Sequence, residues 1–420
     1  MDGKEKYRIE EFYLPNGLRV ILKRVNSPKV SGALIVRCGP NYENKDNNGI
    51  SHFLEHLVYM SGKGASRRSL ATYKIERTGA DLTPRTGKTY TEYNFDLPHA
   101  RWTGLLRATL DAIANPDFSR KIFQNEQKIV ANEILDDDKW TVFADKLVFP
   151  HHLLGTPILG TVKNIYSFTI RRLRAWHRKF YQPQRMVLVV AGNLSTAQLM
   201  RVLRRTKLFF LENKGIVIPE PVSPKIKWGE KDVDYLGENK LKIFFPVPLD
   251  SEKRLFFLYF LRIINDRSIV AIYSKIVSES GLHSGMAIDE DEYTELHDFF
   301  GYSSIDFWAP SHKILRRMER IFFNWLKKVA KNGLRKDMVY RVYCQAALEA
   351  NLNSDYAEWW RDRILEAVVG NFFSSFEAYI NPTSMDFETV KKGLEDFILE
   401  NLCKNIIIIR NLKKKAKEEK

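Results

Sequence analysis

The sequence His52-Phe53-Leu54-Glu55-His56 places two histidines and a glutamate within five residues. On a helix, positions three and four apart lie on one face, so the pattern predicts a helix whose imidazoles point to the same side. Imidazoles are common zinc ligands, and three protein ligands with one open position are typical of catalytic rather than structural sites. A nearby carboxylate that does not bind the metal can take a proton from its water. The stretch therefore predicts part of a catalytic metal site.

A second helix, expected over residues 118–139, carries the candidates for a third ligand. Its apolar stripe includes Phe123 and Val130, and Glu126 and Glu133 lie seven residues apart alongside that stripe. A carboxylate beside a buried stripe needs a partner, because a buried unpaired charge is costly, and a metal would supply one. The alternative is a solvated helix face that happens to carry glutamate. Next to the first motif, we favour the metal site.

The two motifs together resemble those of the pitrilysin or insulinase-type zinc peptidases, a family that includes the mitochondrial processing peptidase. In that family, H-x-x-E-H is followed about 75 residues later by E-x6-E, as it is here. The likeness covers residues 8–200 well and the remainder weakly. Further similar stretches lie at residues 14–20, 49–52, 79–82, 89–90, 160–161, 181–183 and 186–193.

The resemblance implies a role for each residue of the two motifs. His52, His56 and Glu133 would bind one Zn2+ per chain, Glu55 would be the general base, and Glu126 would orient a ligand and so support catalysis. The implied activity is that of a zinc metalloendopeptidase, in which a zinc-activated water hydrolyses peptides or small extended polypeptides.

Thr83 and Pro84 depart from the family, whose members usually have Asn-Ala at these positions close to the scissile bond. Proline lacks an N–H and is tolerated in a sheet mainly on an edge strand. The resemblance implies that a peptide adds a strand to an exposed edge here. We therefore take Thr83 and Pro84 as candidate substrate-binding residues and expect an altered cleavage preference.

Residues 276–284 depart further. Catalytic members usually carry an arginine here and a tyrosine seven residues later, which hold the substrate backbone and the oxyanion. Gly281-Leu282 keep the register, so Val277 and Ser284 take those two positions, and neither can replace the usual donor. In two-chain members, the zinc half and the Arg/Tyr half can lie on different polypeptides. The resemblance thus implies a heterodimer with a homologous subunit that carries the Arg/Tyr pair, with a homodimer as the alternative.

Length and pattern predict an α+β protein of two domains. The resemblance implies two structurally similar halves, each a mostly antiparallel mixed sheet packed with helices. Residues 213–232 are rich in proline and lack a helical stripe, so we place a linker there, between a zinc-binding domain (1–212) and a C-terminal domain (233–420). We expect strands at 18–23, 33–38, 81–97, 186–191, 240–245, 288–308 and 405–409, and helices at 69–78, 101–114, 170–179, 253–264 and 271–280. The strand at 405–409 should take the place that 186–191 has in the first half.

The formal net charge of +15 is the unusual feature of the composition. The basic residues are dispersed and form no nucleic-acid-binding motif, so we expect a solvated surface and no nucleic acid, with a positively charged chamber for acidic peptides as the alternative. No apolar run is long enough to span a membrane. The first residues lack the apolar core of a signal peptide, and the three cysteines (Cys38, Cys344, Cys403) lack CxxC spacing, so we expect reduced packing residues and a cytoplasmic location.

Two other functions of the same fold stay open. One is a subunit that removes a leader or presequence from a specific precursor, which the sequence does not separate from general peptide cleavage. The other is a non-catalytic scaffold subunit, against which the intact five-residue motif with Glu133 in register argues.

Overall fold

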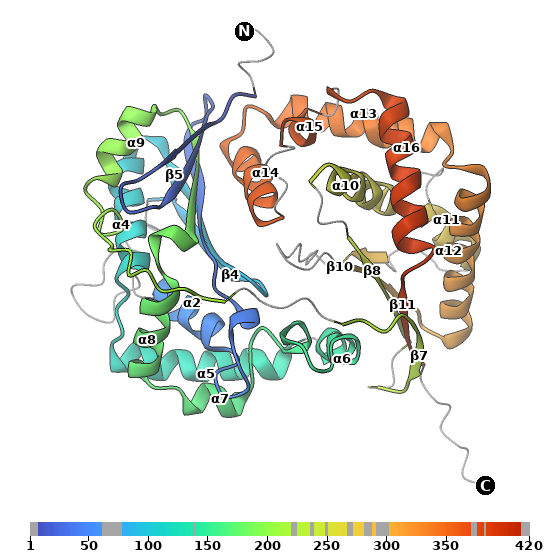
Figure 1. Ribbon diagram of the computed structural model, residues 1–420, viewed down its shortest axis with the longest axis horizontal. Helices are drawn as coiled ribbons and strands as arrows, with labels where there is room; N and C mark the ends of the chain where they lie inside the picture. The colour runs from blue at the N-terminus through green and yellow to red at the C-terminus, as the bar shows by residue number, and fades with distance from the viewer. Residues whose placement is uncertain are drawn as a thin grey trace. The chain divides into compact units, whose positions relative to one another are not determined.

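The computed structural model describes two compact units, each with one sheet covered by helices (Figure 1). Unit 1 comprises residues 1–142, 150–222 and 352–366, and unit 2 comprises residues 143–149, 223–351 and 367–420. Within these limits the structure describes residues 7–60, 78–137, 139–219, 225–235, 239–247, 251–266, 272–280, 288–290, 302–370, 376–381 and 384–412.

The sheet of unit 1 has six strands in the order β1-β2-β6-β3-β5-β4. Neighbouring strands are antiparallel except β2 and β6, which are parallel. The central strands β3 and β6 are rich in β-branched residues, and nearly all of their residues are buried on both faces of the sheet. The strands are β1 (Glu10–Tyr13), β2 (Arg19–Arg24), β3 (Lys29–Val36), β4 (Asp81–Thr86), β5 (Thr91–Pro98) and β6 (Met186–Gly192).

Most helices of unit 1 lie on one side of its sheet, as Figure 1 shows for α4, α8 and α9. Their apolar faces form one core with the strands, which includes Phe53 of α2 and Leu188 of β6. The helices are α2 (Ile50–Met60), α4 (Trp102–Ala114), α5 (Arg120–Asp136), α7 (Val162–Ser167), α8 (Ile170–Phe180) and α9 (Thr196–Leu203), followed by the first residues of α6 (Lys139–Val148).

The sheet of unit 2 repeats the plan of the first sheet. Its order is β7-β11-β8-β10-β9, with β7 and β11 parallel and the other pairs antiparallel. Strand for strand this matches β2-β6-β3-β5-β4, so the predicted α+β class with two similar, mostly antiparallel halves is confirmed, and β11 has the place of β6. The strands are β7 (Gly229–Val233), β8 (Lys240–Pro246), β9 (Ile288–Glu290), β10 (Tyr302–Trp308) and β11 (Ile407–Asn411). The helices are α10 (Ser251–Asn265), α11 (Ile272–Ser280), α12 (His312–Asn332), α13 (Lys336–Asn353), α15 (Phe376–Ile380), α16 (Phe387–Phe397) and the later residues of α14 (Ala357–Val369).

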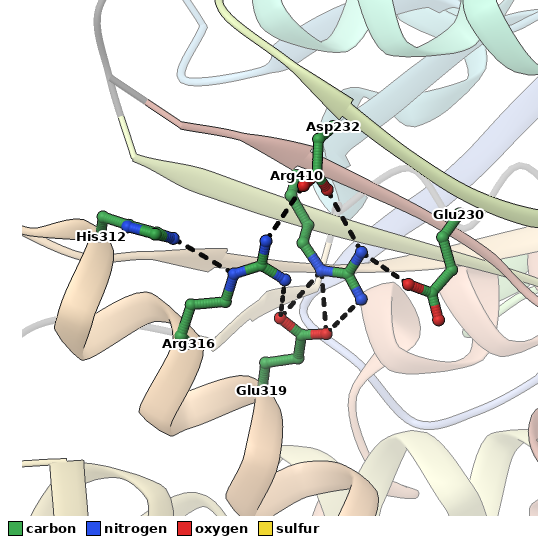
Figure 2. A network of polar contacts seen from close by, with 6 residues as sticks. All are labelled: Glu230, Asp232, His312, Arg316, Glu319 and Arg410. Carbon is green, nitrogen blue, oxygen red and sulfur yellow. Dashed lines mark hydrogen bonds and ion pairs between the residues drawn. The ribbon is translucent and has the colours of Figure 1, made fainter. Parts of the chain in front are cut away.

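Strand β7 lies inside residues 213–232, where the sequence predicts only a linker. Its sequence Gly-Glu-Lys-Asp-Val has no apolar alternation, and four of its five residues are exposed. Arg410 of β11 holds it to the sheet: the guanidinium reaches Glu230 at 2.7 Å, Asp232 at 3.3 Å and Glu319 of α12 at 2.9 Å (Figure 2). Backbone pairing and ion pairs therefore form this edge strand without a hydrophobic pattern.

Residues 352–366 pack with unit 1 although they lie far along the chain. Trp360 is fully buried, with the Lys23 ammonium 4.2 Å from its ring, and Arg361 forms an ion pair with Asp96 of β5 at 3.1 Å. Conversely, residues 143–149 belong to unit 2, although the residues before and after them in the chain belong to unit 1. The division falls between residues 222 and 223, inside the expected linker, but the units are not the contiguous ranges 1–212 and 233–420. Those boundaries stay a prediction about which segments fold independently.

Other predicted elements are present with shifted ends. The strand expected over 81–97 is the hairpin of β4 and β5, and the helix expected over 118–139 is α5. The helix expected over 69–78 lies almost wholly outside the described residues. All three cysteines are free; Cys38 is buried as expected, whereas Cys344 and Cys403 are exposed, so the expectation of packing was wrong for these two. Among the described residues, no helix is long and apolar enough to cross a membrane.

Candidate metal centre

Helix α2 is held at its N-terminus by a buried carboxylate. Glu43 accepts hydrogen bonds from the backbone N–H groups of Gly49 at 2.7 Å and Ser51 at 2.9 Å, which satisfies two helix donors and places a negative group at the positive end of the helix. Gly49 has φ +91, and a Cβ there would lie 2.6 Å from the carbonyl oxygen of Leu159, so only glycine fits at this entry. The start of the motif helix is thereby fixed.

Helices α2 and α5 bring the three predicted ligands together. Glu133 Oε2 lies 3.3 Å from His56 Nε2 and 3.9 Å from His52 Nε2. One ligand atom from each residue falls within 4.8 Å of the others, and no other group of three His, Cys, Asp or Glu side chains in the described chain does this. Phe53 of α2 packs on Phe123 of α5 with ring centroids 5.4 Å apart. Apolar packing thus sets the distance between the two helices.

Glu126 lies where the predicted supporting carboxylate should be. It is 1% exposed, and its Oε2 accepts a hydrogen bond of 3.0 Å from His56 Nδ1. With its proton on Nδ1, the His56 ring has Nε2 available as a ligand atom on the side of Glu133. Glu126 therefore contacts Nδ1 of His56, and Glu133 contacts Nε2 of the same ring.

Glu55 lies on α2 beside the ligands and is buried. The Thr86 hydroxyl, at the end of β4, donates a hydrogen bond of 2.6 Å to Glu55 Oε2. Since the Thr86 hydroxyl is bound to Oε2, the other oxygen of Glu55, Oε1, is available to accept a proton from a reacting group. The sequence analysis missed Thr86, although the period of two along a strand puts it on the same face as Pro84. Glu43 was also missed, and no local pattern signals it.

The electrostatics of the site differ from residue to residue. Burial lowers the pKa of His52 to about 3, so its imidazole is neutral. Burial also disfavours charge on His56, but hydrogen bonds to Glu126 and Glu133 outweigh this and raise its pKa to about 10, so without a metal both ring nitrogens carry a proton. A metal bound at Nε2 would take the place of the proton on that nitrogen. Burial raises the pKa of Glu55 to about 7, against the opposing effects of His56 and Thr86. The hydrogen bond from His56 lowers the pKa of Glu133.

The donor set fits a zinc ion. Two imidazole nitrogens and one carboxylate oxygen are common zinc ligands, and ligand atoms about 2.0–2.2 Å from one ion in tetrahedral arrangement lie roughly 3.4 Å apart. The two distances to Glu133 Oε2, 3.3 and 3.9 Å, bracket this separation. Within the described chain, the buried atoms His52 Nδ1 and Glu126 Oε1 have no hydrogen-bond partner. The site thus contains buried polar atoms whose hydrogen-bonding capacity the protein itself does not satisfy.

The candidate substrate residues lie on an edge. Thr83 and Pro84 belong to β4, the last strand in the order of its sheet, which is where the proline of an edge strand is tolerated. Pro84 pairs with Tyr93 on the inner side, and the Thr83 hydroxyl donates to Asp81 at 3.3 Å. Val277 falls in α11, whereas Ser284 lies outside the described residues, so the absent Arg/Tyr pair remains an observation on the sequence.

Comparison with known proteins identifies relatives of both halves. The family model "Insulinase (Peptidase family M16)" matches residues 19–153, and "Peptidase M16 inactive domain" matches residues 167–342. The "Uncharacterized zinc protease YmxG" of Bacillus subtilis is 31% identical over 195 residues, which are 44% of this chain and 47% of that protein. The "Probable mitochondrial-processing peptidase subunit beta" of Schizosaccharomyces pombe is 29% identical over 207 residues, 47% of this chain and 44% of that protein. The chain spans about half the length of the curated relatives it matches.

The fold is also known from solved structures. A protease from Helicobacter pylori superposes with a TM-score of 0.81 at 15% sequence identity, covering 96% of this chain and 99% of that chain. At this level of identity the similarity concerns the fold alone.

Proposed function

Because this chain belongs to the M16 peptidase family, we propose that it is a zinc-dependent endopeptidase subunit that hydrolyses peptides or small extended polypeptides. One observation carries the proposal: His52, His56 and Glu133 converge within 4.8 Å. Glu55 lies beside them on the same helix, buried and held by Thr86. A scaffold subunit needs neither feature, and the relatives include proteins named as zinc proteases.

Each residue of the site has a defined task in this proposal. His52 and His56, through Nε2, and the Glu133 carboxylate would hold the ion, and Glu126 would keep the His56 ring in its binding tautomer. When bound, zinc supplies a Lewis acid that polarises the peptide carbonyl and makes water acidic enough to react near neutral pH. Glu55 accepts the proton of the attacking water on Oε1 and delivers it to the leaving amine.

Substrate would bind along β4. As an edge strand, it offers backbone groups to which an extended peptide can add in sheet geometry, with Thr83 and Pro84 nearest the scissile bond. Pro84 has no N–H to donate, so binding at that position would depend on its carbonyl and on the neighbouring residues. Recognition of the backbone rather than of side chains suits a peptidase of broad preference.

We further propose that the chain acts with a homologous partner. Val277 and Ser284 supply neither a guanidinium nor a phenol for the oxyanion, and a partner with the Arg/Tyr pair would supply both. The relatives named subunit beta of a processing peptidase support this arrangement and also favour the second candidate, removal of a presequence from a defined precursor. A homodimer is the alternative assembly, and the cytoplasmic location stays a prediction.

Glu55→Gln tests the central claim. The variant keeps the shape of the side chain and removes the base, so we expect bound zinc to stay near one per chain while cleavage of a quenched peptide falls at least a hundredfold. Asp136→Asn is the matched control, because it makes the same change at an exposed position of α5. Assays with and without a co-expressed homologous subunit test the partner. Hydrolysis at the normal rate by Glu55→Gln would refute the assignment of the base.

A further inference from the structure

A cavity of about 880 Å3 lies in unit 1 outside the metal centre, and we call it the α8 cavity. One wall is the face of α8 that carries Arg171, Arg174 and Arg178; the others are the turn after α4 and the side chains of Leu211 and Lys214. None of the metal-centre residues lines it. The family resemblance assigns it no role, and the proposed peptidase reaction does not use it.

The rim of the α8 cavity is strongly basic. Arg171, Arg174, Arg178 and Lys214 line it, all four are exposed, and the lining contains no carboxylate. Within the part of the chain that the structure describes, none of the four has an ion-pair partner. This differs from other cations of unit 1, such as Arg361, which binds Asp96. Arg174 lies over the ring of Phe118, with its guanidinium carbon 5.5 Å from the ring centroid, and keeps its charge there. Four cations without a carboxylate partner around one hollow create a positive potential that attracts acidic groups.

The residues at the floor of the α8 cavity are buried, and their polar groups already have hydrogen-bond partners within the protein. Gln182 is 1% exposed; its amide donates to the carbonyl oxygen of Arg178, and its Oε1 accepts from the backbone N–H of Lys214 at 3.0 Å, which ties two walls together. His177 stacks on Tyr181 with ring centroids 4.3 Å apart, and burial lowers its pKa to about 4, so it adds no charge. The hollow is thus a fixed feature with a cationic rim and a neutral floor.

We propose that the α8 cavity binds an acidic segment of a partner protein, whose apolar side chains enter the hollow while flanking carboxylates pair with the arginines of α8. Ile170 and Leu211 supply apolar lining for such anchors. Arg171 and Arg178 are seven positions apart, about 10 Å along the helix axis, which three residues of an extended segment span at about 3.3 Å each. A buried apolar centre with an arginine-rich polar rim is the usual composition of a protein interface. A small inorganic anion would use the cations and leave the apolar lining uncovered.

Fluorescence anisotropy with a defined probe tests the proposal. The probe is a labelled nine-residue peptide in which Asp and Glu alternate with Leu and Phe. The triple variant R171Q/R174Q/R178Q should bind it at least tenfold more weakly than the unchanged protein. The matched control R201Q/R204Q/R205Q removes three exposed arginines elsewhere in unit 1 and should change affinity less than twofold. Binding should also weaken as salt is raised, because exposed charges are screened.

Several outcomes would overturn the proposal. Equal weakening in both triple variants would mean adsorption driven by net charge. Equal affinity for an all-Glu peptide of the same length would show that the apolar lining is not used. Tripolyphosphate bound more tightly than the probe would make the cavity a small-anion site. Cleavage of a short neutral peptide should be unchanged in R171Q/R174Q/R178Q, so this inference and the proposed peptidase function can fail separately.

Discussion

Thr86 offers a sharp test of how Glu55, the proposed general base, is held. Its hydroxyl donates a hydrogen bond of 2.6 Å to Glu55 Oε2, and both residues are only 6% exposed. Thr86→Val removes the hydroxyl with almost no change of side-chain volume. The carboxylate then loses the donor that holds Oε2, and Oε1 is no longer fixed toward the reacting water.

The size of the effect follows from that contact. A hydrogen bond to a charged group contributes about 1.5–3 kcal/mol, and each 1.36 kcal/mol of lost transition-state stabilisation is about a tenfold loss of rate. We therefore expect kcat/KM of Thr86→Val to fall roughly 10- to 150-fold. Thr86→Ser keeps the hydroxyl and should stay within about threefold of the unchanged enzyme, apart from a small packing loss.

The assay is cleavage of a quenched peptide by zinc-loaded protein, with bound metal measured in parallel. Thr109→Val is the matched control: Thr109 is also buried, but its hydroxyl has no partner among the described residues, so activity should be unchanged. Full activity of Thr86→Val, or an equal loss in Thr86→Val and Thr86→Ser, would refute the reasoning, because the hydroxyl would then have no role of its own.

Three further predictions concern metal affinity and stability. Glu126→Gln should weaken zinc binding about 10- to 100-fold in competition with a chelator, because the carboxylate that orients His56 loses its charge; unchanged affinity would contradict that role. Arg410→Met leaves the buried Glu319 with Arg316, at 3.4 Å, as its remaining ion-pair partner among the described residues. The variant should destabilise unit 2 by roughly 2 kcal/mol in urea unfolding, whereas adding Glu319→Gln should restore part of the loss. Burial lowers the pKa of His177 from 6.5 to about 4, so the unfolded chain takes up the proton first. The contribution of the neutral His177 to the free energy of unfolding should be fully present above about pH 6.5 and should fall by up to about 3 kcal/mol toward pH 4. Urea unfolding of His177→Gln at several pH values should show a flatter pH dependence.

The candidate metal centre could be predicted because its information is local. His52 and His56 share a helix face by spacing alone, and Glu126 and Glu133 lie beside an apolar stripe that must be buried. Once two helices pack by such stripes, the polar residues at their borders face one another. The structure brings His52, His56 and Glu133 together and places Glu126 within hydrogen-bonding distance of His56.

The parts that the sequence did not predict depend on contacts between distant residues. Strand β7 has no apolar pattern, and its pairing with β11 and its ion pairs to Arg410 involve residues about 180 positions away. Trp360 has the apolar character of any core residue, and nothing near it in the sequence indicates that it packs with unit 1. Glu43 acts on the start of α2 from six residues before Gly49, farther than a capping box reaches.

The repeated topology explains why one chain carries one candidate metal centre. Helix α10 follows β8 as α2 follows β3, so the second sheet has a helix in the corresponding place. In α10, however, Phe257 and Phe260 are buried and pack on Phe397 with ring centroids 5.9 and 5.5 Å apart. In unit 1, helix α2 presents the candidate ligands; in unit 2, the corresponding helix α10 packs in an aromatic core. Under the proposed function, Val277 and Ser284 supply no oxyanion donors at the positions of the Arg/Tyr pair, and a homologous partner chain would supply them.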